Sequence, residues 1–132
     1  MIMSIHDILK SDSQGCEIMA REQFQTLSEP MYYILLSLLE EECGVDIMNK
    51  VGKLSGGRIS VGPGTLYTLL DKFLKAYMIA ETKVEGRRKS YIITNSGKEA
   101  LMMEQKRLKK MLEDGAMFEH GSDKYKEGGA AK

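Results

Sequence analysis

The sequence predicts a mainly α-helical fold with one small β-hairpin, and three observations support this prediction. Apolar residues recur at helical spacing along most of the chain. Gly62 and Pro63, near the middle of the chain, give a strong helix start signal. A short run of β-branched residues with a glycine turn follows that helix. The 132 residues suffice for one domain with a modest core, which a second subunit would help to complete.

Residues 1–27 are expected to form an N-terminal helical extension. Ser4 and Asp7 match a capping box ahead of Ile8 and Leu9, residues 11–15 break this first helix, and residues 16–25 form a second candidate. We expect the extension to pack against the long C-terminal helix described below, or against that helix of a partner subunit.

Two further helices are expected before Pro63. Ser28, Glu29 and Pro30 start one that should end near residues 40–42, and its apolar stripe comprises Met31, Ile34, Leu35, Leu38 and Leu39. Residues 46–54 form the next, which Gly56 and Gly57 end. Residues 58–60 are predicted to be a brief strand.

The helix that starts at Pro63 has an N-terminal end with little bulk. Proline suits the first helical position and Gly62 suits the cap. Small and hydroxyl-bearing residues then lead the helix, while the core-facing positions carry Leu66, Leu69, Leu70 and Phe73. Such an end can approach a phosphate or a groove.

A basic hairpin follows this helix. Residues 79–84 and 89–93 are predicted strands around a turn at Glu85 and Gly86, with Tyr91 and Ile93 on one face. Three consecutive cations, Arg87, Arg88 and Lys89, should lie at its tip. A helix whose N-terminus carries small polar residues, followed by a basic hairpin, is typical of a winged helix-turn-helix. In this fold the helix enters the major groove of DNA and the wing contacts the backbone. We assign residues 28–94 to this domain.

The remaining residues are expected to mediate dimerisation. Thr94 can cap a helix over residues 95–117, and the apolar stripe of this helix needs a second copy to cover it: Leu101, Leu108, Met111 and Leu112. We therefore assign residues 95–118 to a dimerisation helix. Residues 119–132 are predicted to be a disordered tail.

Charge is distributed unevenly although the net charge is zero. Residues 44–98 hold ten Lys or Arg against four Asp or Glu, a net charge of +6, and the remainder carries −6. Cations are thus concentrated where DNA phosphates would be contacted.

The candidate DNA contacts lie on this helix and the hairpin: Gly64, Thr65, Tyr67, Thr68, Lys72, Arg87, Arg88 and Lys89. The three hairpin cations could instead only solubilise the tip. Tyr67 could be a core residue or a phosphate contact. Which of Thr65 and Thr68 reads a base edge is left open, and lysines 50, 53 and 72 imply no base specificity.

The chain resembles the PadR family of bacterial transcriptional regulators from about residue 32 to residue 101. The resemblance rests on YYILLSLL at residues 32–39, GVDI at 44–47, SGGR at 55–58, GTLY at 64–67, GRRKSY at 86–91, IT at 93–94 and Gly97. It departs at Thr68, where many members carry proline, and at Tyr77, where glycine usually closes the helix. A left-handed conformation is costly for tyrosine, so we expect the helix to end differently here.

The resemblance implies a dimeric regulator, usually a repressor, bound to a pseudo-palindromic operator in double-stranded DNA. An effector in such families shifts the spacing of the two recognition helices. The methionines at 102, 103, 111 and 117 could be ordinary packing residues or could line a site for a small hydrophobic effector. A competing hypothesis is a winged-helix adaptor that binds proteins and no operator, although it would not need the wing cations. A DNA-binding protein of a mobile element is a third.

Other classes of function find no support in the sequence. The sequence contains no nucleophile next to a base, no P-loop and no pair of carboxylates suited to catalysis. His6 and His120 lack further ligands for a metal site, so we expect neither enzyme activity nor a cofactor. No run is long enough to span a membrane and no secretory signal is visible. Cys16 and Cys43 share no CxxC pattern, which favours a cytoplasmic protein. Cys43 could be a redox sensor, but the acidic residues 40–42 favour a small helix-end residue.

Overall fold

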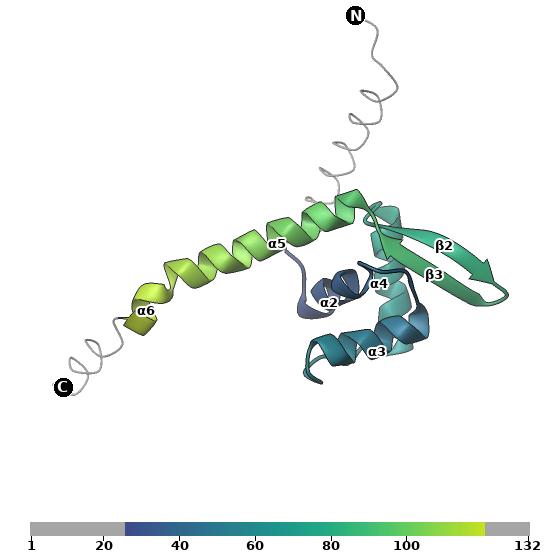
Figure 1. Ribbon diagram of the computed structural model, residues 1–132, viewed down its shortest axis with the longest axis horizontal. Coiled ribbons are helices and arrows are strands. Elements are labelled where there is room, and N and C mark those ends of the chain that lie inside the picture. Colours follow the sequence, from purple (N-terminus) through teal and green to yellow (C-terminus); the bar gives the residue numbers. More distant parts are fainter. Residues whose placement is uncertain (1–25, 121–132) are drawn as a thin grey trace, which may run out of the picture. The chain divides into compact units, whose positions relative to one another are not determined.

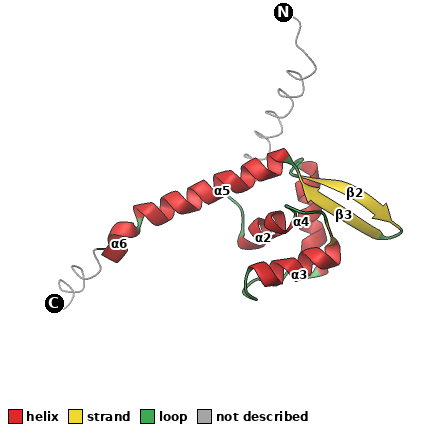
Figure 2. Cartoon of the chain, viewed as in Figure 1, coloured by secondary structure: helices red, strands yellow, loops and turns green. Residues whose placement is uncertain are grey.

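The computed structural model describes residues 26–120, and the predicted helices of residues 1–25 lie outside this range. Its elements are α2 (Glu29–Ser37), β1 (Glu42–Cys43), α3 (Gly44–Leu54), α4 (Pro63–Lys75), β2 (Ile79–Glu85), β3 (Arg88–Ile93), α5 (Asn95–Asp114) and α6 (Ala116–His120) (Figure 1). The mainly helical class with a small hairpin is therefore confirmed (Figure 2). The chain divides into two compact units between Leu101 and Met102.

Helix α2 starts and helix α3 ends on the predicted signals, whereas α3 begins at Gly44, two residues earlier than predicted. The Ser28 hydroxyl accepts a hydrogen bond from the Met31 N–H at the start of α2, although α2 ends at Ser37, earlier than expected. After α3, Gly56 and Gly57 take positive φ angles, and the Gly57 N–H bonds to the Gly52 carbonyl. This arrangement is a Schellman end.

Helix α4 ends in a way that the sequence does not predict. Tyr77 adopts a φ of 60°, and the Met78 N–H donates to the Phe73 carbonyl as in a Schellman motif. The expectation that this bulky residue would change the helix end is wrong. The Thr94 hydroxyl donates to the Tyr77 carbonyl at 2.6 Å and the Thr94 N–H to the Met78 carbonyl, so the start of α5 helps to hold the strained turn in place.

The sheet has three antiparallel strands in the order β1-β3-β2. Its first strand is Glu42–Cys43, and the prediction of a strand at residues 58–60 is wrong. There the Ile59 N–H bonds to the Ser55 hydroxyl at 3.0 Å instead of to a neighbouring strand. Between Glu81 and Lys83 the pairing with β3 slips, which leaves Thr82 as a bulge in β2.

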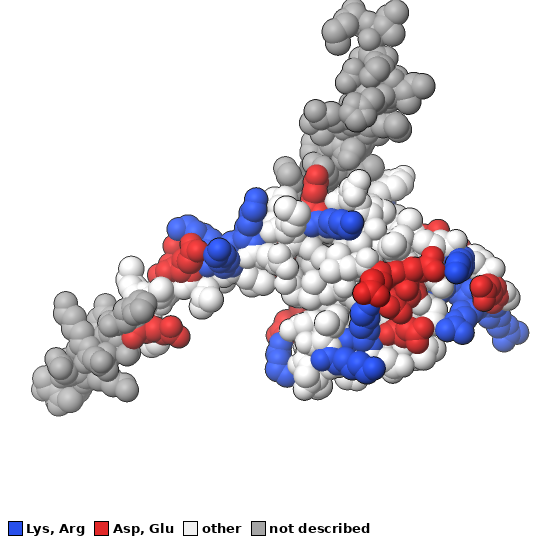
Figure 3. Space-filling model, viewed as in Figure 1, with Lys and Arg blue, Asp and Glu red and all other residues white. Residues whose placement is uncertain are grey.

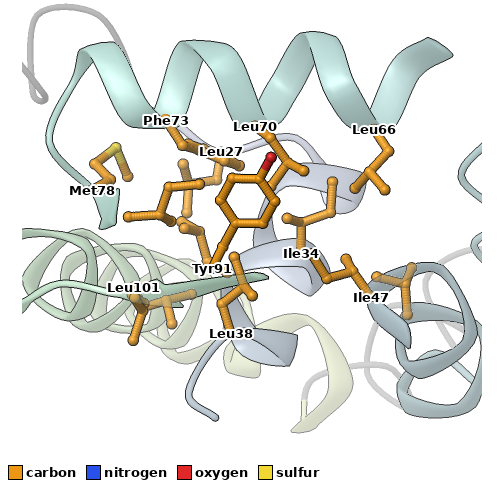
Figure 4. Packing of buried hydrophobic residues seen from close by; sticks show 14 of the residues in the cluster. Leu27, Ile34, Leu38, Ile47, Leu66, Leu70, Phe73, Met78, Tyr91 and Leu101 are labelled. Carbon is orange, nitrogen blue, oxygen red and sulfur yellow. The ribbon is translucent and has the colours of Figure 1, made fainter. Parts of the chain in front are cut away.

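One core joins α2, α3, α4 and the sheet. Helix α4 contributes Leu66, Leu70 and Phe73, each at most 1% exposed, and Figure 4 shows them facing Ile34 of α2, Leu38 just after that helix, and the Tyr91 ring of β3. Tyr91 and Ile93 share the buried face, as predicted. Leu27, which the predicted N-terminal extension includes, belongs to this core as well.

Helix α5 begins on its predicted cap. The Gly97 N–H donates to the Thr94 hydroxyl at 3.1 Å. A Cβ at Gly97 would overlap the Met78 carbonyl and the Ile93 side chain, so the close approach of α5 to the end of α4 requires a glycine.

The C-terminal helix differs from the prediction in three respects. It is interrupted at Gly115, and α6 continues to His120, so the tail cannot begin at residue 119. The other tail residues lie outside the described range. Leu101 is 4% exposed within the core of its own chain, so it was wrong to expect it on an uncovered stripe.

Candidate nucleic-acid interface

The exposed face of α4 is small, polar and free of acidic residues in its first turn. Gly62 caps the helix and Pro63 opens it, as the sequence predicts. Because Leu66, Leu70 and Phe73 are buried, the opposite face of the same helix is left in solvent, with Gly64, Thr65, Thr68 and Lys72 exposed.

The fold itself does not require a glycine at position 64. A Cβ built there meets no atom within 4 Å, and the residue does not have a positive φ angle. The same holds at Gly62. The small size of this helix end therefore has no explanation within the described chain, whereas a close approach by another molecule would explain it.

The polar side chains of this face keep free hydrogen-bonding capacity. The Thr68 hydroxyl donates to the Gly64 carbonyl at 2.9 Å, which leaves its oxygen able to accept a bond. Lys72 forms no ion pair within residues 26–120, unlike its neighbour Lys75, which pairs with Asp71 at 3.0 Å. Lys72 is thus an uncompensated cation on the exposed face.

The hairpin turn presents only one of the three predicted cations. The turn consists of Gly86, with a φ of 62°, and Arg87, while Arg88 and Lys89 already belong to β3. The predicted turn at residues 85–86 is therefore one residue early. A glycine with positive φ at the first position suits a two-residue hairpin loop. Arg87 makes no ion pair with any described residue.

A concave surface of about 400 Å³ lies between α3, α4 and the hairpin. It is lined by Cys43, Gly44, Val45, Asp46, Tyr67, Arg87, Arg88 and Lys89. The Tyr67 hydroxyl lies so close to Gly44 that a Cβ there would overlap it, although half of the tyrosine is exposed. Tyr67 therefore packs on the start of α3 and also faces the concavity.

Arg88 crosses from the hairpin to the start of α3. One guanidinium nitrogen donates to the Cys43 sulfur at 3.1 Å and lies 3.6 Å from an Asp46 carboxylate oxygen. The Cys43 thiol in turn donates to that oxygen at 3.2 Å. The hydrogen bond to Cys43, together with the negative charge of Asp46, raises the pKa of Arg88, and the guanidinium is positively charged as in any arginine.

Two other cations of the hairpin, Lys83 and Lys89, are also compensated by carboxylates of the same chain. Lys89 lies 3.9 Å from Glu81, and Lys83 lies 3.5 Å from Glu41. A hydrogen bond from Thr82, the bulge residue, lowers the pKa of Glu41, and the nearby charge of Lys83 acts in the same direction. Figure 3 shows acidic and basic side chains interspersed over the face of α3 and the hairpin. The net charge of +6 thus overstates the cations that are free to meet DNA.

The structure brings only part of the predicted site together. Tyr67, Arg87, Arg88 and Lys89 line one concavity, whereas Gly64, Thr65, Thr68 and Lys72 lie on α4 outside that lining. Four further lining residues are not predicted from the sequence as members of the site: Cys43, Gly44, Val45 and Asp46. GVDI was noted only as a motif, and nothing in its sequence indicates the distant contact with Arg88.

The second unit carries the remaining residues predicted for dimerisation. Leu108, Met111 and Leu112 are 44%, 57% and 72% exposed. In α6, Met117 and Phe118 are also largely exposed, and Phe118 is not among the residues predicted from the sequence. Within residues 26–120 we find no cluster of metal-ligating side chains and no helix long and apolar enough to cross a membrane.

Residues 34–103, more than half of the chain, match the family described as "Transcriptional regulator PadR-like family". The chain belongs to this PadR-like family. The match covers the core of the winged helix, the hairpin and the first part of α5. The expected family membership and the winged-helix fold are thereby confirmed.

Solved structures agree with this assignment. A PadR-like transcription factor from Bacteroides fragilis is 26% identical, with a TM-score of 0.54 over 80% of this chain and 94% of that one. RosR of H. salinarum, in a structure described as a complex, is 23% identical, with a TM-score of 0.56 over 85% and 97%. A transcriptional regulator from Clostridium thermocellum is 18% identical, with a TM-score of 0.57 over 67% and 90%. The search of curated proteins found no match to this chain.

Proposed function

We propose that this PadR-like protein binds double-stranded DNA in a sequence-specific manner. Its α4 helix would enter the major groove, and the turn of the β2–β3 hairpin would contact the backbone beside it. The observation that supports this proposal most strongly is the exposed face of α4, where Gly64 and Thr65 precede an uncompensated Lys72 and no acidic residue occupies the first turn.

The physical argument follows from the helix end. The first turn of a helix carries unpaired N–H groups and a partial positive charge, which favour a phosphate or the acceptor groups of base edges. Thr65 and Thr68 offer hydroxyl groups to base edges, whereas Lys72 and Arg87 offer charge to phosphates. In this proposal Arg87 is the principal phosphate contact of the hairpin, and Tyr67 contacts a phosphate from the edge of the concavity.

Selection of bound fragments from genomic DNA by the purified full-length protein tests this function. We expect recovery of a small set of sites that share a pseudo-palindromic sequence, with affinity that falls steeply as salt is raised. An Arg87→Ala variant should bind all sites more weakly and with a salt slope reduced by about 0.9. Failure to enrich any sequence would contradict operator binding and favour the adaptor hypothesis.

We further propose that the protein is a dimer through the exposed stripe of α5, now reduced to Leu108, Met111 and Leu112. An exposed apolar stripe in a regulator of this kind is best explained by burial against a second copy. Two recognition helices related by a two-fold axis would then match the two halves of the operator.

Sedimentation at micromolar concentration tests the dimer. Leu108→Glu places a carboxylate against its symmetry mate, so desolvation and repulsion should make the protein monomeric and weaken operator binding. Lys109→Gln changes the net charge by the same amount at an exposed neighbouring position and should leave the dimer intact. A monomeric wild type would contradict the proposed dimer, and a dimeric Leu108→Glu protein would show that the interface lies elsewhere.

Repression is the regulatory outcome that we propose, since a dimer seated on its operator can block access to a promoter. We propose cytoplasmic action, consistent with the free thiol of Cys43. A small hydrophobic effector that binds between the methionine-bearing α5 helices could shift the spacing of the two α4 helices. Titration of candidate apolar ligands against a preformed DNA complex would test for such release.

A further inference from the structure

The contact between Arg88 and the start of α3 lies within the concavity. All three members of this contact, Arg88, Cys43 and Asp46, line it. Cys43 is buried, whereas the side chains of Arg88 and Asp46 are 65% and 51% exposed. The ion pair is therefore one that water and competing anions can reach, and such a pair is weak enough to be exchanged for another.

A DNA phosphate and the Asp46 carboxylate would compete for the same guanidinium. Arg88 can donate to a phosphate in the concavity only if it reduces its contact with Asp46 or shares its donors with it. For DNA that lies loosely against the protein, Asp46 is the nearer partner, so Arg88 contributes little.

We propose that Asp46 is a specificity-determining residue that withholds Arg88 from non-specific DNA. This inference rests on the proposed function, because it presumes that the concavity faces a DNA backbone. When α4 is seated in the major groove of its operator, the hairpin is held against the backbone and a phosphate is fixed near Arg88. Only then does the exchange of Asp46 for phosphate become favourable, because specificity is a difference between two affinities.

The proposal predicts that one mutation raises the affinity for random DNA and lowers specificity. Loss of a carboxylate should strengthen binding to random DNA, while binding to the operator, where Arg88 is already released, gains less. For Asp46→Asn we expect random-sequence affinity to rise by about two- to fivefold, the size expected for one exposed ion pair. The salt slope on random DNA should steepen by about 0.9, because one more cation meets a phosphate. The ratio of operator to random affinity should therefore fall.

Two comparisons separate this effect from a general change in charge. Glu29→Gln breaks a similarly exposed pair, Arg58–Glu29 at 2.8 Å, which does not border the concavity, so it should leave the affinity ratio and the slope unchanged. In an Arg88→Gln background, Asp46→Asn should have no more effect than Glu29→Gln, because Asp46 acts through Arg88. Thermal unfolding checks that each variant folds, and Asp46→Ser replaces Asp46→Asn if the latter does not.

The experiment measures the affinity of the full-length dimer for its selected operator and for random duplex DNA at several salt concentrations. A fall in the affinity ratio that depends on Arg88 supports the proposal. An unchanged ratio, an effect that persists in the Arg88→Gln background, or weaker binding by Asp46→Asn would overturn it, the last by showing that Asp46 orients Arg88 toward DNA. Wild-type protein that binds no DNA would instead refute the proposed function.

Discussion

The two faces of α4 contrast in nearly every respect. One face carries Leu66, Leu70 and Phe73, which are almost inaccessible to solvent and join the core, whereas the other carries Gly64, Thr65 and Thr68, which are exposed. The buried face explains why the helix is stable where it is. The exposed face contributes little to that stability, so its composition is free to serve binding.

The largest effect is expected on the buried face. Phe73→Ala removes a fully buried ring from the centre of the core, and we expect it to cost about 3–5 kcal/mol of unfolding free energy. Chemical denaturation followed by circular dichroism measures this cost. A loss below about 1 kcal/mol would show that the core collapses easily around the gap.

The exposed face should show the opposite behaviour. Thr65→Ala and Thr68→Ala should each change stability by no more than about 0.5 kcal/mol, because both side chains lie in solvent. The threonine that reads a base should lose about 1–3 kcal/mol of discrimination at one operator position. Affinities for a set of single-base operator variants identify it, and a uniform loss over all variants would indicate a backbone contact instead.

At the end of α4 we expect a smaller change in stability, and glycine should be more stabilising there than alanine. At an ordinary helical position alanine is more stabilising than glycine, but at Tyr77 the φ of 60° penalises every side chain with a Cβ. We therefore expect Tyr77→Gly to be more stable than Tyr77→Ala by about 1 kcal/mol, and thermal unfolding of the two variants measures the difference. Equal stabilities would mean that the turn relaxes when the tyrosine ring is removed.

Much of the fold could be predicted because local chemistry determines it. Pro63 fixes the start of α4, Thr94 caps α5, and alternation along β3 places Tyr91 and Ile93 in the core. The two-residue strand β1 is too short to show an alternating pattern. Residues 58–60 do not form the predicted strand, and the Ile59 N–H donates to the Ser55 hydroxyl instead of to a neighbouring strand. The burial of Leu101 depends on how the start of α5 meets the core, which helical periodicity alone does not specify.

The candidate site was predicted less completely than the fold. The exposed threonines and the turn arginine follow from local patterns, but the pairing of Arg88 with Cys43 and Asp46 joins residues that lie more than forty positions apart. Charge counting treats Arg87, Arg88 and Lys89 as equivalent. Only the three-dimensional arrangement shows that Arg87 makes no ion pair among the described residues, while the other two each face a carboxylate.

The most direct test of the contrast is the operator affinity of a Gly64→Leu protein together with its melting temperature. A Cβ at position 64 meets no atom of the chain, so we predict that the melting temperature does not fall, whereas operator affinity drops at least about tenfold because the added bulk separates α4 from the groove. Gly52→Ala, which replaces an equally unobstructed glycine on α3, should leave operator affinity unchanged. Normal operator binding by a folded Gly64→Leu protein would contradict the claim that this face of α4 binds DNA.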